Sequence, residues 1–246
     1  MSEILKLYKR LGETPLECIE RFKAGRPEYE NTPMTYLGRL DPMAEGLLFV
    51  LAGDTRNKDE YLEWDKAYEF EVLWGFETDT YDTLGLITAT GRMPLDLEKK
   101  MPKMLKVIAN KKTQVYPAYS SRTVGGKPLH AWAREGKIDE VDIPTRQIKI
   151  FNIEHIRTRM LKQSEILEEI LKNIDLVKGD FRQEEIASLW KRMLKPGELA
   201  LISKFKADVS SGTYIRSLAH EMGKLLDTHA LAYSIKRTRV GEHKLQ

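Results

Sequence analysis

Hydrophobic and polar residues alternate along several short stretches of this chain, a period of two that is typical of β-strands with one buried face. The clearest case is residues 68–74, where aromatic and aliphatic residues alternate with two glutamates. Residues 47–51 are entirely apolar, which predicts a central strand buried on both faces. The same criteria predict further strands at residues 4–8, 84–89, 115–120, 147–156, 199–209 and 233–240.

Apolar residues recur every three or four positions elsewhere, which predicts amphipathic helices. Pro15 opens one of them, and Leu16, Ile19 and Phe22 are expected on its buried face before Gly25 ends it. Further helices are predicted at residues 95–108, 128–135 and 214–226, with a short polar helix from Asp54.

Residues 161–195 have a different character, because two helical runs follow one another with Gly179-Asp180 between them. This pattern predicts a helical hairpin inserted between two strands. Strands and helices interleave along the rest of the chain without an internal repeat or a long linker. We therefore expect residues 1–246 to form one domain of the α+β (mixed α/β) class.

The chain has 246 residues, of which 41% are hydrophobic and 31% charged, and this composition is typical of a soluble globular protein. No apolar run is long enough to span a membrane, and the first ten residues lack the apolar core of a signal peptide. Cys18 is the single cysteine, which excludes an internal disulfide and a cysteine-based metal site. We expect a cytoplasmic protein with no membrane contact.

The net charge is only +3, but the basic residues are clustered. Six lysines lie within residues 99–112, among them Lys103 and Lys106. The end of the chain adds Lys236, Arg237, Arg239 and Lys244. Such clusters on a nearly neutral protein indicate contact with a polyanion, and Lys103, Lys106, Lys236 and Arg237 are the candidate residues. The alternative for the 99–106 cluster is a solvated helix face.

Asp41 is the first candidate for chemistry. It lies between Gly38, which permits backbone conformations closed to other residues, and Pro42, which fixes the chain direction. A rigid loop that leads into the buried strand at residues 47–51 holds one carboxylate in one place. An Asp-Pro pair is also common in ordinary turns, so this segment alone does not decide between the two roles.

Six other segments repeat the pattern of one family in the same order as the Asp41 loop. They are L-Y-K-R-L-G at residues 7–12, D-K-A-Y with T-D-T-Y-D-T-L-G at residues 65–85, Q-V-Y-P-A-Y-S-S at residues 114–121, residues 127–136, P-T-R-Q-I at residues 144–148, and S-G-T-Y-I-R-S-L at residues 211–218. Each piece alone is weak, but seven in order over nearly the whole chain outside 161–195 resemble the TruB family of RNA pseudouridine synthases.

The resemblance implies a mixed, mostly antiparallel sheet flanked by helices, with the 161–195 hairpin as an insert. It also implies that Asp41 is the catalytic residue and that Arg216 is its partner cation. Tyr68 would stack on the flipped uracil and take part in proton transfer. Tyr214 would line the same pocket, and Ile235 would contact the uracil.

The residues alone leave other interpretations open. Arg216 could be a surface arginine on a helix, and Tyr68 a tyrosine of the sheet core. Asp79 and Asp82, three positions apart, could bind a cation or act as an acid–base pair, but no further ligands are apparent nearby. The five histidines show no metal-like spacing. We therefore expect neither a metal nor a cofactor, since the reaction breaks a glycosidic bond and rejoins the ring without a redox step.

The chain departs from the family pattern at a few positions. Tyr36 replaces a histidine that is thought to help extrude the base, and an aromatic face for stacking is retained. Glu45 replaces a small residue and adds negative charge near Asp41, and Arg10 stands where proline is usual. The sequence given stops at Gln246, so a C-terminal RNA-binding domain is not expected.

The resemblance predicts a tRNA pseudouridine synthase that acts on the T-loop uridine, position 55, as a monomer that binds the T-arm. One alternative is a non-catalytic tRNA-binding or tRNA-folding module on the same scaffold, which Tyr36 and Glu45 favour. Another is a related synthase that acts on a different RNA.

Overall fold

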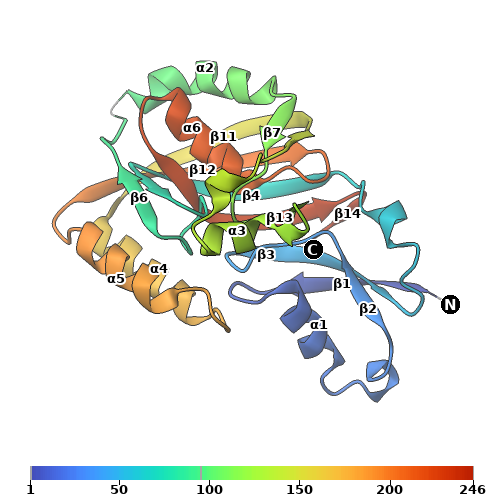
Figure 1. The fold of residues 1–246 in the computed structure, drawn as a ribbon. Helices are drawn as coiled ribbons and strands as arrows, with labels where there is room; N and C mark the ends of the chain where they lie inside the picture. Colours follow the sequence, from blue (N-terminus) through green and yellow to red (C-terminus); the bar gives the residue numbers. More distant parts are fainter. Residues whose placement is uncertain (1, 95, 246) are drawn as a thin grey trace.

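The computed structural model describes residues 2–94 and 96–245. Its centre is an eight-stranded sheet in the order β1-β3-β13-β4-β12-β11, with β2 added to β3 and β14 added to β13 (Figure 1). The strands are β1 Glu3–Lys9, β2 Met34–Leu37, β3 Ala44–Ala52, β4 Lys66–Trp74, β11 Ile150–Lys162, β12 Leu199–Val209, β13 Ala230–Val240 and β14 His243–Lys244.

Neighbouring strands of this sheet run antiparallel except β13 and β3, which pair in parallel at Ile235–Ala44. The predicted α+β class with a mostly antiparallel sheet is confirmed. The parallel contact places the ends of two sequence-distant motifs side by side, because β3 follows the Asp41 loop and β13 contains Ile235.

Helices cover both faces of the sheet, and residues of β4 pack against the helices on each side. Tyr68, Phe70 and Val72 pack into a core with helices α2 (Leu97–Ala109) and α6 (Ile215–Leu225). Leu73 points to the opposite face and packs with helices α4 (Gln163–Asp175) and α5 (Gln183–Met193). Figure 1 shows α2 and α6 above the sheet and the α4–α5 pair below it.

The predicted helical insert is confirmed: α4 and α5 connect β11 to β12, which pair with each other along their whole length. Buried apolar residues at helical spacing hold it against the sheet, among them Ile166, Ile170 and Trp190. The two helices thus take the place of a short turn between β11 and β12 and form a separate layer on the sheet.

The smaller elements frame the ends of the sheet. Helix α1 (Pro15–Lys23) packs on β3 through Cys18 and Ile19, and helix α3 is Leu129–Arg134. Short strand pairs are β5 Phe76–Thr78 with β6 Ile87–Thr90, β7 Thr113–Val115 with β10 Thr145–Gln147, and β8 Thr123–Val124 with β9 Lys127–Pro128. Three 3₁₀ turns lie at Pro27–Tyr29, Lys58–Tyr61 and Ile138–Glu140.

Some local predictions need correction. Leu16 is 58% exposed, because Thr14 caps α1 in a position that turns Cys18 and Ile19, and not Leu16, toward β3. The extended segment expected at 115–120 ends at Val115, and the polar helix from Asp54 is only the 3₁₀ turn at Lys58–Tyr61. The predicted helix start at residue 95 lies outside the described residues, and α2 is described from Leu97. Within the described part of the chain, no helix has the length and apolar character needed to cross a membrane.

Candidate active site

The Asp41 loop joins β2 to β3 and presents one carboxylate to one guanidinium. Arg216, in the first turn of α6, donates from Nε to Asp41 Oδ2 over 2.8 Å. The arginine side chain is only 4% exposed, whereas that of Asp41 is 38% exposed. The acid is therefore accessible to a reactant while its counter-ion is enclosed, as a carboxylate nucleophile requires.

Two backbone carbonyls fix the remaining nitrogens of Arg216. Nη1 donates to the Thr80 carbonyl and Nη2 to the Tyr119 carbonyl, each over 2.7 Å. These carbonyls belong to two of the sequence motifs that precede α6 in the chain. A guanidinium held at three points has one orientation, so it offers Nε to Asp41 without a conformational search.

A cavity of about 310 Å³ opens beside this pair. Its lining brings together Asp41, Tyr68, Tyr214, Arg216 and Ile235, which come from four different segments of the chain. Tyr68 and Ile235 lie on neighbouring strands, β4 and β13, with their side chains on the same face of the sheet. Burial raises the pKa of Tyr214, and the charge of Asp41 acts in the same direction.

Gln114 explains how Tyr214 is placed. Its amide oxygen accepts from the Tyr214 backbone N–H over 2.8 Å, and its Nε2 donates to the Tyr214 carbonyl over 3.1 Å. The Q-V-Y-P motif therefore clamps the residue that precedes α6. Tyr214 is the N-cap residue of that helix, so this clamp also helps to position Arg216.

Tyr36 lies apart from the first cavity. It lines a second cavity of about 450 Å³ on the other side of Asp41 and Arg216, and the Arg39 guanidinium carbon lies 5.4 Å from the centre of its ring. The two cavities share the Asp41–Arg216 pair as a common wall. An aromatic face thus lines the same cavity as Asp41, although not the cavity that contains Tyr68.

The charged side chain of Lys66 also lines the first cavity, although the sequence analysis gave this residue no role. Its Nζ donates to the Trp64 carbonyl and, over 3.1 Å, to Ser211 Oγ. Burial lowers the pKa of Lys66 to about 8, and the charge of Arg237 adds to the shift. The sequence did point to this residue, since the lysine belongs to the D-K-A-Y motif. Its burial, however, depends on contacts with residues 62–64 and Ser211, which the motif does not reveal.

Arg237, a predicted contact for the RNA backbone, is not a surface residue. It is 1% exposed, and it donates from Nε to the Leu47 carbonyl over 2.7 Å and from Nη1 to the Arg39 carbonyl over 2.9 Å. The side chain lies under the Asp41 loop because odd-numbered residues of this part of β13 face the cavity. Arg237 therefore braces that loop from within the protein.

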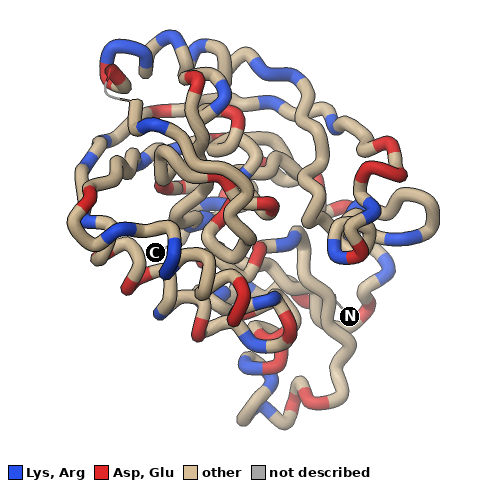
Figure 2. The backbone as a smooth tube through the Cα atoms, turned by 60° about the vertical axis from the view of Figure 1, so that its left-hand side comes forward, with Lys and Arg blue, Asp and Glu red and all other residues tan. Residues whose placement is uncertain are grey.

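The other basic candidates lie away from the cavities. Lys103 and Lys106 are exposed on α2, and Lys236 points to the opposite side of β13 from Ile235, with its Nζ 6.0 Å from the centre of the Tyr8 ring. None of the three lines either cavity. Figure 2 shows basic and acidic positions interspersed over the backbone, with several basic positions along the α2 segment.

The two acids Asp79 and Asp82 have separate structural partners. Asp82 is buried and accepts from Thr80 Oγ1 over 2.7 Å and from the Leu84 N–H over 3.0 Å. Burial raises the pKa of Asp82 to about 6, against the attraction of the Arg216 guanidinium. Asp79 pairs with Arg182 over 2.7 Å. Among the described residues, no three His, Cys, Asp or Glu side chains form a group that could hold a metal ion.

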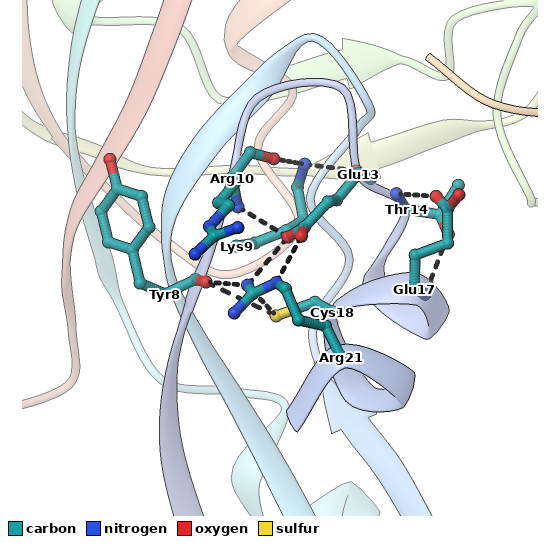
Figure 3. A network of polar contacts seen from close by, with 8 residues as sticks. All are labelled: Tyr8, Lys9, Arg10, Glu13, Thr14, Glu17, Cys18 and Arg21. Atoms are coloured by element: carbon teal, nitrogen blue, oxygen red, sulfur yellow. Dashed lines mark hydrogen bonds and ion pairs between the residues drawn. The ribbon is translucent and has the colours of Figure 1, made fainter. Parts of the chain in front are cut away.

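The turn between β1 and α1, whose own polar contacts Figure 3 shows, supports the Asp41 loop from outside. The Gly12 N–H donates to the Pro42 carbonyl over 2.9 Å. The turn itself is held by Lys9, whose buried Nζ donates to the carbonyls of Arg10 and Glu13. Burial lowers the pKa of Lys9 to about 8, against the attraction of Asp41.

The sequence departures are accommodated locally. The Arg10 N–H donates to Glu13 Oε2 over 2.9 Å, a bond that a proline at this position could not make. Glu45 accepts from the Tyr8 hydroxyl over 2.6 Å at an exposed site. Its neighbour Ala44, on the opposite face of β3, is the residue that packs into the core with Tyr68. The carboxylate of Glu45 is thus directed toward Tyr8 and away from the first cavity, which it does not line.

Comparison with known proteins places these motifs in one family. Residues 26–174 match the family described as TruB family pseudouridylate synthase (N terminal domain), which is more than half of the chain. The chain belongs to this family. The TruB family match includes the Asp41 loop, both motifs of residues 65–85 and the Gln114 segment, and it ends within α4.

Curated relatives of the TruB family match over more of the chain. A protein of Caldanaerobacter subterraneus subsp. tengcongensis named tRNA pseudouridine synthase B is 30% identical over 81% of this chain and 66% of its own length. A protein of the same name from Psychrobacter cryohalolentis is 27% identical over the whole chain and 57% of its own length. The one from Aquifex aeolicus is 27% identical over 98% of this chain and 69% of its own length. The chain thus spans roughly three-fifths of the length of these relatives.

Solved structures show the same fold. A chain in the crystal structure of a Cbf5-Nop10-Gar1 complex superposes with a TM-score of 0.59 at 20% identity, over 99% of this chain and 50% of that one. A chain in the structure of an H/ACA RNP bound to a substrate RNA containing 2'-deoxyuridine gives a TM-score of 0.52 at 19% identity, over 99% and 49%. The pseudouridine-synthase-like sheet expected from the resemblance is confirmed by these structures.

Proposed function

We propose that this chain is an RNA pseudouridine synthase that uses Asp41 as its nucleophile. The observation that supports it most strongly is the Asp41–Arg216 pair at the wall of a cavity lined by Tyr68, Tyr214 and Ile235. The acid is partly exposed and its cation is buried, so the carboxylate can reach a bound base while it keeps its contact with Arg216. A cavity of about 310 Å³ accommodates one extruded nucleotide.

The chemistry requires one carboxylate and one enclosed base. A uridine turned out of its RNA would enter between Tyr68 and Ile235, where an aromatic ring and an aliphatic side chain can hold the uracil. Asp41 attacks the sugar or the base, and the bond between the sugar and N1 breaks. The ring then rejoins the sugar through carbon 5, the bond to Asp41 breaks, and the carboxylate is regenerated. The proton displaced from carbon 5 must then leave, and the Tyr68 hydroxyl is the group proposed to help transfer it.

The proposed substrate is the T-loop uridine of tRNA at position 55, bound through the T-arm by a monomer in the cytoplasm. The support for tRNA is that the curated relatives are named tRNA pseudouridine synthase B. Because the chain spans only part of their length, its own substrate needs a direct test.

The test is to incubate the protein with unmodified tRNA transcripts and to map pseudouridine by chemical probing. The T-loop uridine should be converted by the wild type and not by Asp41→Asn, which keeps the shape of the side chain and removes its charge. Asp175→Asn, at an exposed position at the end of α4, is the matched control and should react as fast as the wild type.

Two outcomes would contradict this proposal, and each would favour a different function. Tight tRNA binding by wild type and Asp41→Asn alike, without conversion of any uridine, would indicate a non-catalytic binding module. Conversion absent from tRNA, with pseudouridine sites lost from other cellular RNAs in a deletion strain, would indicate a related synthase with a different substrate.

A further inference from the structure

The turn of the helical hairpin reaches the two segments that orient Arg216. Arg182, the residue just before α5, donates from Nη1 to Asp79 Oδ2 over 2.7 Å and from Nη2 to Asp79 Oδ1 over 3.4 Å. Its guanidinium carbon also lies 4.6 Å from the centre of the Tyr119 ring. One planar cation thus contacts an acid and an aromatic ring that are 40 positions apart in the chain.

Both contacts lead directly to the Asp41–Arg216 pair. Asp79 precedes Thr80, whose carbonyl accepts from Arg216 Nη1, and Tyr119 itself supplies the carbonyl that accepts from Nη2. These carbonyls are two of the three acceptors that orient the Arg216 side chain. A shift of either segment would therefore rotate the guanidinium away from Asp41.

The turn is built to hold Arg182 in place. Its backbone has φ 64° and ψ 29°, a left-handed conformation that costs free energy for any residue with a side chain. Gln183 secures the turn by donating from Nε2 to the carbonyls of Val177 (3.0 Å) and Gly179 (2.7 Å). Arg134 of α3 adds a bond to the Asp180 carbonyl over 2.8 Å. An unfavourable backbone conformation retained by this many contacts indicates that the direction of the Arg182 side chain matters.

The hairpin also shares a core with the Asp41 loop. Met43, two residues after Asp41, and Leu84, two residues after Asp82, pack in the same apolar cluster as Ile170 and Trp190. The body of the hairpin is therefore fixed relative to the loop that it supports. Arg182 extends this support from apolar packing to the polar groups of the site.

We propose that Arg182 is a positioning residue for the Asp41–Arg216 pair and acts through Asp79 and Tyr119. The inference rests on the proposed function, since its effect is on the rate of the isomerisation. A lysine could keep the ion pair but not stack as a planar group on Tyr119 while it contacts both Asp79 oxygens.

The test compares kcat and KM from steady-state rates over a range of concentrations of a tRNA transcript. Arg182→Ala should lower kcat about 10- to 100-fold, because a small displacement of a catalytic group has an effect of this size. KM should change by less than about threefold, and Arg182→Lys should recover part of the lost rate. Lys178→Ala removes a cation from the exposed part of the same turn and should leave both constants unchanged.

A double-mutant cycle separates positioning from general loss of structure. Asp79→Asn should slow the reaction, and adding it to Arg182→Ala should cost little more, because both changes break the same link. Circular dichroism spectra at the assay temperature, together with thermal melts, establish that each variant is folded in the assay. Wild-type kcat in a folded Arg182→Ala protein would refute the inference.

Two further outcomes separate a failure of the positioning role from a failure of the proposed function. A rise in KM with a flatter salt dependence and unchanged kcat would make Arg182 an RNA contact, which also refutes the positioning role. A wild-type protein that converts no uridine in any RNA would instead refute the proposed function, and the inference would fall with it.

Discussion

At the scale of single residues, the site is organised by where charge is buried. Arg216 is enclosed and bonded at three nitrogens, so Asp41 faces a fixed positive charge on one side and the cavity on the other. Lys66 and Arg237, both buried, add positive charge beneath the same cavity. This distribution of positive charge favours the approach of a polyanion.

Tyr68→Phe should separate stacking from proton transfer. The ring remains, so tRNA affinity should stay within about twofold of wild type. Loss of the hydroxyl should lower kcat by about 100-fold or more, the usual contribution of a general acid or base. Binding and single-turnover assays measure the two effects. Tyr233→Phe, which removes a hydroxyl bonded to Glu169 on the other face of the sheet, is the control, and equal rates in both variants would assign Tyr68 to packing.

The titration of Lys66 should change the free energy of unfolding at alkaline pH. Its pKa of about 8 in the folded protein is below the unfolded value of about 10.5, so between these values the unfolded chain binds more protons. The free energy of unfolding therefore rises with pH in this window, by about 1 to 2 kcal/mol from pH 8 to pH 9.5 for this one group.

The measurement is denaturant unfolding of wild type and Lys66→Met at several pH values from 7 to 9.5. The difference between the two proteins isolates Lys66, because Lys9, with a similarly lowered pKa, is present in both. Parallel curves across pH 8 to 9.5 would show that Lys66 titrates as it does in the unfolded chain.

At the scale of elements, strands and helices bring the motifs together. The parallel contact of β13 with β3 puts Ile235 beside Ala44, three residues after Asp41. The hairpin of α4 and α5 covers the opposite face and is tied to the motif after β5 by Trp190, whose Nε1 donates to the Thr83 carbonyl over 3.1 Å.

Trp190→Phe tests how firmly the hairpin is anchored. The change leaves the buried Thr83 carbonyl without its donor and opens a small cavity, so unfolding should become easier by about 2 to 4 kcal/mol. Chemical denaturation measures the loss. Trp132→Phe removes an equivalent bond, to the Val124 carbonyl, at a less buried position and should cost under about 1 kcal/mol. Equal losses in the two variants would contradict the anchoring role.

At the scale of the whole molecule, the helices divide the surface into two sides of the sheet. The exposed lysines of α2 lie on the side of α6, which carries Arg216, whereas the hairpin lies on the other. An RNA arm held at the first cavity is larger than the cavity and must rest on the surface around it.

Lys103→Ala with Lys106→Ala should therefore weaken tRNA binding and flatten its salt dependence. Each lost phosphate contact reduces the slope of log affinity against log salt by about 0.9 on a duplex. Equilibrium binding at several salt concentrations gives the slope. Lys172→Ala with Lys178→Ala removes the same charge from the hairpin and should leave the slope unchanged. A wild-type slope in the α2 double variant would make that cluster ordinary solvated surface.

The sequence alone determined the longer elements and the order of the motifs. Periodicity located β12 at Leu199–Val209 and the two helices of the insert, because these patterns reflect burial on one face of a regular element. The motif series identified Asp41, Tyr68, Tyr214, Arg216 and Ile235, which the fold gathers around one cavity. These residues could be identified from the sequence because the residues of a motif keep a fixed spacing along the chain.

Only the tertiary structure decided which charges are buried and which side chains meet across the fold. Arg237 is indistinguishable from Lys236 in sequence, yet strand alternation and the Asp41 loop bury the one and not the other. Lys66 is buried by contacts with distant segments, and Arg182 reaches Asp79 from 103 positions away. The burial of a side chain, its pKa and its hydrogen-bond or ion-pair partners depend on distances in space. Local patterns of residue type do not contain those distances.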